Sequence, residues 1–384
     1  MPDGAAPTGE AQAEAASRRA ELVLPYGVGG LDVVVPAGVL PDPLAAPGNR
    51  LSWPGAKLVF KRVVADFSVD AVTDRAASLT YYTLLAIAPA ILATYSLVLM
   101  LLPRDGTDAP QMLRDLLTRY VPEALQSQAV ELLDTIVGTP AENTIALAVS
   151  VAVSLLSASA YVRSFSRNAN VIYGRIEGRT LVVTWVTMWA VTLVLEAGAL
   201  VIILAALLRE SIITGVLAPV ARPLGLTGEV EYLTGIFLPV WSWLQLPFIV
   251  LVSLGLVSML FYFTPNARRG RFRPFTPGSV FAVAVSAASW TVFTLYLSAV
   301  GVRSAYGAFG TVLTVLVLVW FMNVVLLLGV KIDAEVLRAR ELQVGYDAER
   351  VIQAQPKSME AVQFRLRVQR WLDRAAEDVK NRNA

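Results

Sequence analysis

The sequence predicts an all-α integral membrane protein with six transmembrane helices and additional amphipathic helices at the membrane surface. Of its 384 residues, 55% are hydrophobic and only 16% are charged, whereas soluble proteins are about 25% charged. Six apolar stretches reach the roughly 20 residues that a helix needs to cross a bilayer. The loops between these stretches alternate between basic and acidic, as expected for successive loops on opposite sides of a membrane.

The N-terminal segment, residues 1–54, is rich in Ala and Pro and carries scattered charges. It lacks the apolar run behind a basic start that marks a secretory signal peptide. A segment of this composition buries too little apolar surface to offset the entropy that it loses on ordering. We therefore expect a disordered cytoplasmic tail, followed by a membrane domain over residues 55–340.

Amphipathic segments accompany the predicted spans. Within residues 56–67, Lys57 and Lys61 alternate with apolar side chains, which suits a helix lying on the membrane surface. Residues 103–142 have helical periodicity with a charged face, and we expect this region to lie outside the membrane on its extracytoplasmic side. Residues 341–384 are expected to form a charged cytoplasmic C-terminal tail that is partly helical.

The six apolar stretches are the predicted transmembrane helices. Pro239 and Pro247 can each kink or break the fourth of them near its start, because proline removes a helical hydrogen bond. Most of the spans are joined by short loops. The predicted spans cover residues 76–102, 143–163, 181–208, 236–263, 278–300 and 308–332.

The charges of the loops determine the predicted topology. Loops 164–180 and 264–277 are basic, whereas loops 103–142 and 209–235 contain more acids than arginines. Basic loops tend to remain on the cytoplasmic side of a membrane. Six spans satisfy this alternation and place both termini in the cytoplasm, whereas five or seven spans would break it.

The chain contains no Cys and no His. Disulfides, thiolate metal sites and Cys nucleophiles are therefore excluded. The lack of His removes the commonest general base and the commonest metal ligand. We expect no metal site, no cofactor and no catalytic residue, so the protein is not predicted to be an enzyme.

Arginines crowd the loop "PNARRGRFRPF" at residues 265–275. They act as topology signals, and they are also candidates for binding anionic lipid headgroups, because clustered guanidinium groups beside a bilayer attract phosphate. A nucleic-acid role is not expected, since one short basic loop without a stacking platform gives a weak electrostatic footprint. The headgroup candidates are Arg268, Arg269, Arg271 and Arg273.

Glu196 is the one acid in the middle of a predicted span. An ionised carboxylate at the bilayer centre costs at least about 2.5–3.5 kcal/mol. No Lys or Arg lies mid-span, which favours the neutral form of this carboxyl. A neutral carboxyl could form a purely structural hydrogen bond with Asn323, Gln245 or a hydroxyl group. The alternative is a role in proton coupling or substrate binding, and the sequence leaves both interpretations open.

The first turns of the first span are also polar. The stretch "SLTYYTLL" places Tyr81 and Tyr82 beside Ser and Thr residues. Such side chains are unfavourable on a lipid-facing surface, so part of this helix is expected to face other helices or a wet cavity. Tight helix packing with an interfacial Tyr belt is the structural alternative. The candidates for a polar transport path are Glu196, Asn323, Tyr81, Tyr82 and Gln245.

Four stretches carry distinctive motifs: "DRAASLTYYTLLAIAP" (74–89), "SASAYVRSFSRNANVIYG" (157–174), "YFTPNARRGRFRPFTPGS" (262–279) and "YGAFGTVLTVLVLVWFMNVVLLLGVKIDAE" (306–335). In this order and spacing they resemble the signatures of the YihY/BrkB family of bacterial inner-membrane proteins. The residues on the motif positions are Asp74, Arg75, Pro89, Asn170, Pro265, Gly278, Tyr306, Gly307, Gly310, Gly329 and Asp333.

The resemblance implies a six-helix protein of the bacterial cytoplasmic membrane. Members of the family were formerly labelled ribonuclease BN-like and are otherwise discussed as envelope, virulence or transport proteins. Three positions depart from the family pattern: Ala86 replaces a usual Ser, Lys331 a usual Glu and Asp333 a usual Asn. A role carried by that Glu would be missing or inverted here. The acids sit singly or in outer loops, which does not suit metal-dependent cleavage of RNA.

The leading functional hypothesis is a transporter that moves a lipid-like or other amphiphilic envelope molecule through a cavity between helices. Its expected partners are membrane lipids and an amphiphilic substrate, without nucleic acid, and a homo-oligomer is left open. The alternative is an envelope scaffold or interaction protein without transport. A membrane-bound ribonuclease ranks third.

Overall fold

The structure is a computed structural model, and within the part of the chain that it describes every regular element is a helix. Residues 1–49 of the predicted tail, almost all of the predicted amphipathic region 103–142, and Tyr306 lie outside the described residues. The described residues are 50–101, 126, 130–131, 144–208, 227–300 and 307–382.

Long helices lie on all six predicted spans. The fourth begins as the short helix α10 and passes through a π-helical turn, η2, into α11, which continues without a break past Pro247. The described helices are α2 (Trp53–Val69), α3 (Val72–Leu101), α6 (Thr144–Ile172), α7 (Leu181–Leu207), α10 (Thr227–Tyr232), η2 (Leu233–Phe237), α11 (Leu238–Phe263), α12 (Pro277–Val300), α13 (Gly307–Gln343) and α14 (Glu360–Arg382).

Four helical segments of the described chain are long and apolar enough to cross a membrane: Leu181–Ala206, Val230–Phe263, Pro277–Leu295 and Leu313–Gln343. They coincide with the third to sixth predicted spans. Helices α3 and α6 occupy the first two predicted spans but are not among these four segments. The prediction of several membrane-spanning helices is therefore confirmed, whereas the number six stays a prediction.

Contacts between the long helices close a ring, in which each helix packs on its neighbour in the chain. Helix α3 packs on α6, α6 on α7, α7 on α11, α11 on α12 and α12 on α13, and α13 returns to α3. Helices α7 and α11 approach closely at Gly198, where an added Cβ would lie 2.4 Å from a Leu256 methyl carbon. Small residues allow such close approach between membrane helices.

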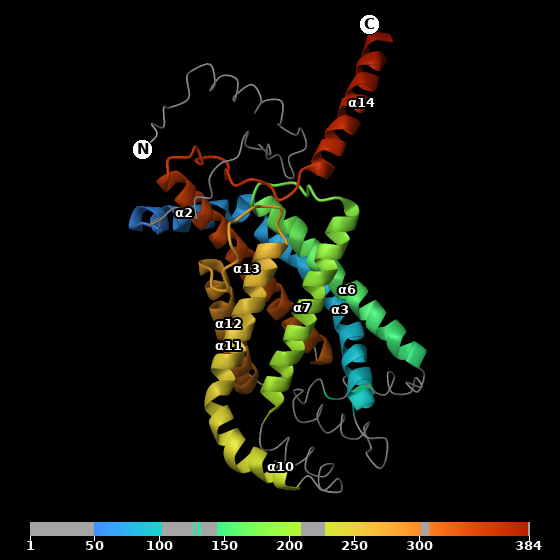
Figure 1. The fold of residues 1–384 in the computed structure, drawn as a ribbon, viewed down its shortest axis with the longest axis vertical. Coiled ribbons are helices and arrows are strands. Elements are labelled where there is room, and N and C mark those ends of the chain that lie inside the picture. The colour runs from blue at the N-terminus through green and yellow to red at the C-terminus, as the bar shows by residue number, and fades with distance from the viewer. Residues whose placement is uncertain are drawn as a thin grey trace.

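Helix α2 lies across one end of the ring (Figure 1). Its N-terminus is capped by Ser52, whose Oγ accepts a backbone hydrogen bond at 3.2 Å. At its other end Ala71 adopts a φ of 47°, a left-handed conformation that allows the sharp turn into α3. Val59 packs on α13, whereas Trp53 is 73% exposed and Phe60 is 71% exposed. Helix α2 thus has one face packed on the protein and another that is exposed, as expected for a helix lying on the membrane surface.

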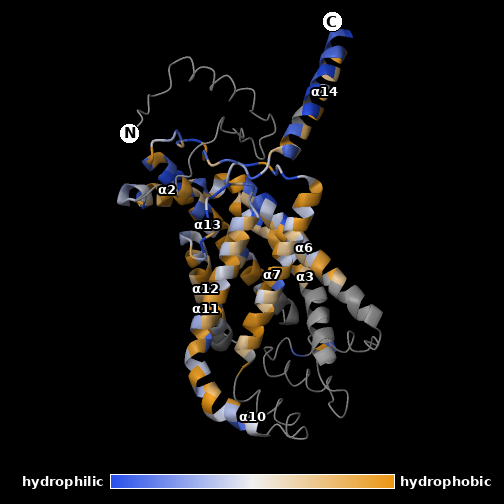
Figure 2. Cartoon of the chain, in the orientation of Figure 1, coloured by the Kyte–Doolittle hydropathy of each residue, from blue (hydrophilic) through white to orange (hydrophobic). Residues whose placement is uncertain are grey.

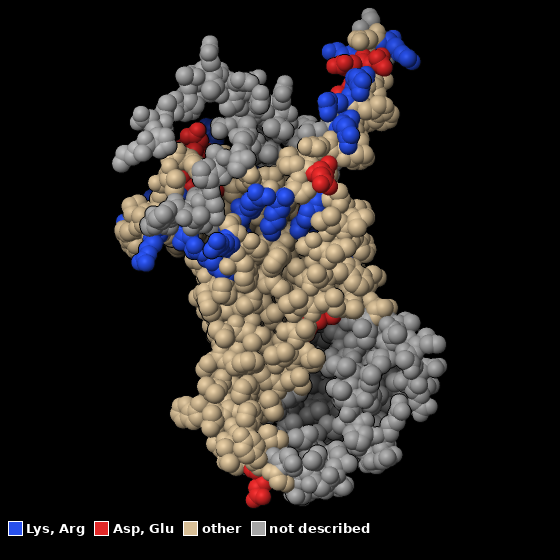
Figure 3. Space-filling view, in the orientation of Figure 1, with Lys and Arg blue, Asp and Glu red and all other residues tan. Residues whose placement is uncertain are grey.

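The outward surface of α7 and α11 is apolar (Figure 2). Leu181, Val186, Trp243 and Leu246 are all more than 60% exposed there. Soluble proteins rarely expose contiguous apolar patches larger than a few hundred Å². In Figure 3 most of the surface between the two ends is uncharged. These observations together describe a membrane protein whose apolar belt faces lipid.

Charged side chains gather at one end of the ring, which we call the polar end (Figure 3). Helix α2, loops 173–180 and 264–276, and the chain after α13 meet at this end. Residues 350–358, which we call the strap, lie against both loops, and α14 then extends away from the body (Figure 1). The predicted boundary at residue 340 falls inside α13.

Candidate functional site at the polar end

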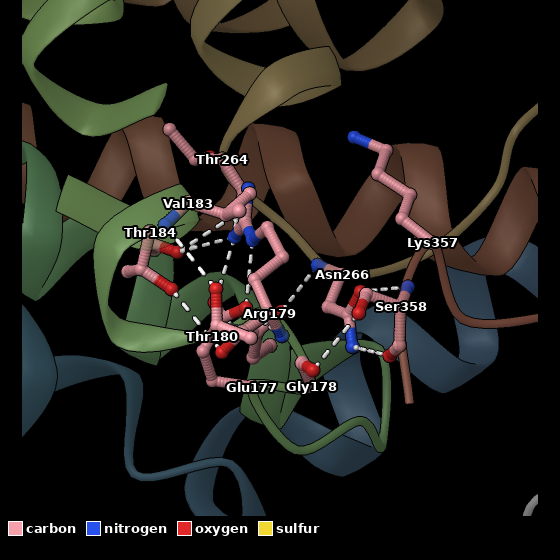
Figure 4. A network of polar contacts seen from close by, with 12 residues as sticks. Glu177, Gly178, Arg179, Thr180, Val183, Thr184, Thr264, Asn266, Lys357 and Ser358 are labelled. Carbon is pink, nitrogen blue, oxygen red and sulfur yellow. Dashed lines mark hydrogen bonds and ion pairs between the residues drawn. The ribbon is translucent and has the colours of Figure 1, made fainter. Parts of the chain in front are cut away.

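An ion pair between Arg179 and Glu177 is central to the network in Figure 4. Arg179 Nε donates to Glu177 Oε1 at 2.7 Å, and Arg179 Nη2 donates to Glu177 Oε2 at 2.7 Å. The guanidinium also donates to the carbonyl oxygens of Phe263 at 3.1 Å and Thr264 at 2.7 Å, which ties the loop after α6 to the end of α11. Burial alone would raise the pKa of Glu177, but hydrogen bonds and charge from Arg179 lower that pKa below its usual range.

Two asparagines connect three separate parts of the chain. Asn170, at the end of α6, accepts a hydrogen bond from Asn266 N at 2.6 Å. Asn266 Nδ2 donates to the carbonyl oxygens of Ile176 at 2.9 Å and Ser358 at 3.0 Å, and Asn266 Oδ1 accepts from Ser358 N at 3.0 Å (Figure 4). Because both ends of the Asn266 amide are used, the strap is held against the two loops in a fixed register.

The middle of the strap is held by a buried cation and a buried acid. Arg175 Nη2 donates to the carbonyl oxygens of Ile352 at 2.5 Å and Ala354 at 2.6 Å. Glu341, at the end of α13, accepts from Gln353 N and Ala354 N, both at 2.8 Å. Burial lowers the pKa of Arg175 to about 10, and the charge of Glu341 opposes this shift. The strap is therefore an integral part of the polar end.

Lys357 is the last charged side chain of the strap. Its Nζ donates to the Tyr262 carbonyl oxygen and lies 5.0 Å from the centre of the Tyr262 ring. Burial, reinforced by the positive charges of Arg269 and Arg179, lowers the pKa of Lys357 to about 7, while Glu177 opposes the shift. A group with this pKa changes its charge near neutral pH.

Docking of the strap is therefore expected to strengthen as the pH rises from about 7 toward 10. The docked strap holds Lys357 with a pKa of about 7, whereas the released strap has its ordinary value of 10.5. Between these values the released form binds more protons, so raising the pH favours docking. Below pH 7 Lys357 is protonated in both the docked and the released strap. The free-energy cost of burying its charge is then at its full value and no longer changes with pH.

Hydrogen exchange of the strap amides, corrected for the intrinsic effect of pH, measures this docking. Lys357→Met should remove the pH dependence and increase protection at pH 7. Lys57→Met, on the exposed face of α2, is the matched control and should leave the wild-type dependence in place. An unchanged pH dependence in Lys357→Met would show that Lys357 is not the group whose ionisation controls docking of the strap.

A second buried group joins α6, α11, α12 and α13. Arg269 Nη1 donates to Tyr173 Oη at 2.5 Å and lies 3.4 Å from Asp333 Oδ2, and Arg269 Nη2 donates to the Phe261 carbonyl oxygen. Asp333 Oδ1 accepts from Gly278 N at 2.8 Å. Arg269 is only 9% exposed. Its side chain is therefore built into the fold, unlike the other three predicted headgroup arginines, which are exposed.

A pocket of about 310 Å³ opens beside this group, at the level where α11 ends and α12 begins. Loop 264–276 forms one wall and is held to α11 by two hydrogen bonds, Ser258 Oγ to the Pro274 carbonyl at 2.6 Å and Tyr262 Oη to the Gly270 carbonyl at 2.8 Å. The lining residues are Ser258, Tyr262, Arg269, Arg271, Arg273, Phe275, Thr276, Pro277, Asp333, Val336, Leu337 and Arg340.

A third charged cluster joins α2 to α13. Lys331 Nζ lies 2.8 Å from Asp66 Oδ2, 2.8 Å from Asp70 Oδ2 and 3.1 Å from Glu335 Oε1. Glu335 also lies 3.0 Å from Arg338 Nε. The Lys331 that departs from the family pattern is therefore surrounded by acids.

Two of the predicted polar candidates, Asn323 and Gln245, already have hydrogen-bond partners. Asn323 on α13 accepts from Tyr161 Oη at 2.9 Å, and its Nδ2 donates to Thr80 Oγ1 at 3.3 Å. Gln245 Nε2 donates to the carbonyl oxygens of Ala205 at 2.7 Å and Ala206 at 3.3 Å. These contacts join neighbouring helices. In both residues the amide serves helix packing.

Glu196 contrasts with these two residues. It is half-buried on α7, and no hydrogen bond or ion pair joins it to another residue in the part of the chain that the structure describes. Tyr81 is 59% exposed on α3, and Tyr82 is half-buried with its ring 5.5 Å from that of Tyr81. The structure therefore does not bring Glu196 together with Asn323 or Gln245 through any described contact.

Comparison with protein-family models matches residues 63–352 to the family described as Virulence factor BrkB. The match covers about three quarters of the chain. The chain belongs to the BrkB family. Comparisons with curated proteins and with solved structures found no match. The family resemblance predicted from the sequence motifs is thereby confirmed.

In this BrkB-family protein, some of the motif residues lie at the polar end and others lie along the helices. Arg75 donates to the Asp70 carbonyl at 2.7 Å and to Asn168 Oδ1 at 3.3 Å, and Pro265 is buried between Thr264 and Asn266. Asp74 is exposed. Gly278 and Gly329 face each other where α12 crosses α13, and α13 begins at Gly307, with Gly310 in its first turn. Pro89 lies within α3.

Several residues at this site were not predicted from the sequence. Arg340 lines the pocket, Glu341 and Lys357 hold the strap, and Glu335 lies at the centre of the α2–α13 cluster. The sequence offered a weak signal for the strap, since the apolar pair Val351 and Ile352 interrupts a charged tail. Among the described residues, no group of three or more Asp or Glu side chains is placed to hold a metal ion.

Proposed function

We propose that this BrkB-family protein transports a lipid-like or other amphiphilic molecule across the cytoplasmic membrane of a bacterium. In this proposal it has six spans, both termini are cytoplasmic, and the polar end faces the cytoplasm. The gathering of Lys and Arg at the polar end supports this orientation, because basic residues favour the cytoplasmic side. The protein acts without catalytic residues and without nucleic acid.

Glu196 is the main observation that supports the proposal. An acid within a membrane-spanning helix is costly and is a functional candidate by default. A structural hydrogen bond to Asn323, Gln245 or a hydroxyl group is the competing explanation. Both amides are engaged elsewhere, and no hydroxyl group is hydrogen-bonded to Glu196 among the described residues. In the proposed mechanism, a cavity between the helices opens alternately to the two sides, and Glu196 changes its protonation as the substrate moves.

Transport by the protein reconstituted in liposomes should depend on pH, and Glu196→Gln should abolish that dependence. Gln keeps the size of the side chain but cannot ionise. The measurement is the movement of a fluorescently labelled amphiphile between the two leaflets at several pH values. Glu231→Gln, an exposed acid near the end of α10, is the matched control and should behave as the wild type. A wild-type protein that moves no amphiphile would refute the transport proposal.

A scaffold role is the second candidate, and α14 is the observation that favours it. One side of this helix carries Phe364, Val368, Trp371 and Val379, all exposed, and the helix stands away from the ring (Figure 1). Removal of residues 360–384 separates the two roles. A scaffold would lose its envelope phenotype on this truncation, whereas a transporter would keep its activity in liposomes.

A further inference from the structure

We propose that helix α2 lies in the headgroup region of the membrane and binds anionic lipid there. In this arrangement Trp53, Phe60 and Val64 insert among the acyl chains, and Lys57 and Lys61 bind the anionic headgroups. The sequence alone predicts a helix on the membrane surface. The structure adds which face of the helix meets the lipid and which charge that lipid carries. The inference does not depend on transport.

The outward face of α2 consists of two adjacent strips. Trp53, Phe60 and Val64 are seven and four residues apart, so they share one side of the helix, and they are 73%, 71% and 60% exposed. Lys57 and Lys61, four residues apart and both exposed, lie along the neighbouring strip. Lys57 Nζ lies 5.5 Å from the centre of the Trp53 ring, so the two strips are in contact. An apolar strip beside a cationic strip is typical of a helix at the membrane interface.

The acids of α2 face the protein and not the outward side. Asp66 is the one acid within the helix, and Asp70 follows at its C-terminal cap. A carboxylate oxygen of each lies 2.8 Å from Lys331 Nζ on α13. The outward face therefore carries positive charge alone, and a face of this charge attracts anionic lipid.

Packing on α13 fixes the orientation of α2. Val59 is 8% exposed and packs with Val336 and Ala339 of α13, on the same side as the ion pairs to Lys331. A rotation of α2 that buried its apolar strip would break these ion pairs and leave buried charges unpaired, which is costly. The large apolar side chains therefore stay outward. A patch of such side chains marks an interaction surface.

The position of α2 places this face at the level of the headgroups. The helix lies across the polar end of the ring, whereas α7 and α11 run along its length (Figure 1). It is joined to α3, on the first predicted span, by a sharp turn at Ala71. Lys and Arg side chains gather at the same end (Figure 3). Trp and basic side chains concentrate where a membrane protein leaves the hydrocarbon region, so lipid is the neighbour that this face meets.

Lipid fits this face better than a second copy of the chain does. In a contact with two-fold symmetry, the same patch meets itself. Lys57 and Lys61 would then face like charges, with no acid on this face to separate them. Anionic lipid instead supplies the opposite charge together with acyl chains for the apolar strip.

Lipid quenching of a fluorescent label on the full-length protein tests the proposal. The chain contains no Cys, so Phe60→Cys provides a single labelling site. The labelled protein is reconstituted in vesicles of phosphatidylcholine and phosphatidylglycerol, with bromine on the acyl chains of one lipid or of the other. We expect quenching by both lipids and stronger quenching by brominated phosphatidylglycerol. Phe364→Cys, at an exposed Phe on α14, is the control label and should not be quenched.

Lys57→Gln and Lys61→Gln, each combined with the label at Phe60→Cys, should reduce the preference for phosphatidylglycerol about fivefold, the contribution of one cation near an anionic membrane. Lys380→Gln removes an exposed lysine from α14 and is the matched control, which should keep the preference of the parent protein. Equal quenching by the two lipids would overturn the binding of anionic lipid. An equal loss of preference in Lys380→Gln would do the same.

The membrane location has its own contradicting result. If neither Phe60→Cys nor Val64→Cys is quenched by lipid, α2 does not lie in the membrane and the proposal fails. Both positions are exposed, so neither label disturbs the packing on α13. Disulfide cross-linking between two Phe60→Cys copies, without quenching by lipid, would assign the face to a second copy of the chain and would also overturn the proposal.

Discussion

Replacement of Glu335 by alanine should lower the free energy of unfolding by about 3–5 kcal/mol, the cost of removing one partner from a buried ion pair. Glu335 is 1% exposed and lies 3.1 Å from Lys331 Nζ, 3.0 Å from Arg338 Nε and 3.9 Å from Arg62 Nε. Its loss would leave these cations close together without their shared acid. Lys331 retains Asp66 and Asp70, so the main cost falls on Arg338.

Chemical denaturation of the purified protein in detergent micelles measures this effect. Asp74→Ala is the control, because Asp74 is an exposed acid at the same end of the ring. Exposed substitutions of this kind usually change stability by no more than about 0.5 kcal/mol. If both variants unfold at the same denaturant concentration, Glu335 does not hold α2 and α13 together.

Gly278→Ala should cost about 1–3 kcal/mol, the usual range for overpacking a dense site. An added Cβ would lie 2.0 Å from the Gly329 carbonyl oxygen and 2.7 Å from Asp333 Oδ1. The first obstacle is backbone, so it cannot turn aside as a flexible side chain would. Helices α12 and α13 would have to separate, which would also weaken the hydrogen bond from Gly278 N to Asp333.

Gly255→Ala provides the opposite case within the same protein. Gly255 lies inside α11, and a Cβ there would meet nothing within 4 Å. Alanine favours a helix by up to about 1 kcal/mol over glycine, so this variant should be neutral or slightly stabilised. The same denaturation experiment serves both variants. Equal stability of the two would show that the crossing at Gly278 is looser than its geometry implies.

The membrane-spanning helices could be predicted because hydropathy is a local property of the sequence. The helical segments at Leu181–Ala206, Val230–Phe263, Pro277–Leu295 and Leu313–Gln343 coincide with predicted spans. Pro247 was predicted to kink or break the fourth span, and α11 continues through it without a break. The family motifs were equally local and led to the confirmed family.

The contacts of the polar end could not be predicted, because they join residues far apart in the chain. Lys331 and Asp66 are separated by 265 residues, and Arg175 and Ala354 by 179. The sequence identified the arginine loop as a candidate, but all of its arginines looked alike. Only their placement separates the buried Arg269 from exposed Arg271 and Arg273.

The packing of α13 on α3 bears on how the protein is made. The contacts from α3 through α6, α7, α11 and α12 to α13 join long helices that follow one another in the chain, so each can form as soon as the next helix enters the membrane, whereas α13 also packs back on α3 and α6. Asp66 and Asp70 are synthesised early but wait for Lys331, which arrives with the last long helix of the ring. A nascent chain that stops before α13 would therefore display unpaired acids on α2, a recognisable mark of incomplete assembly for the quality control of the membrane.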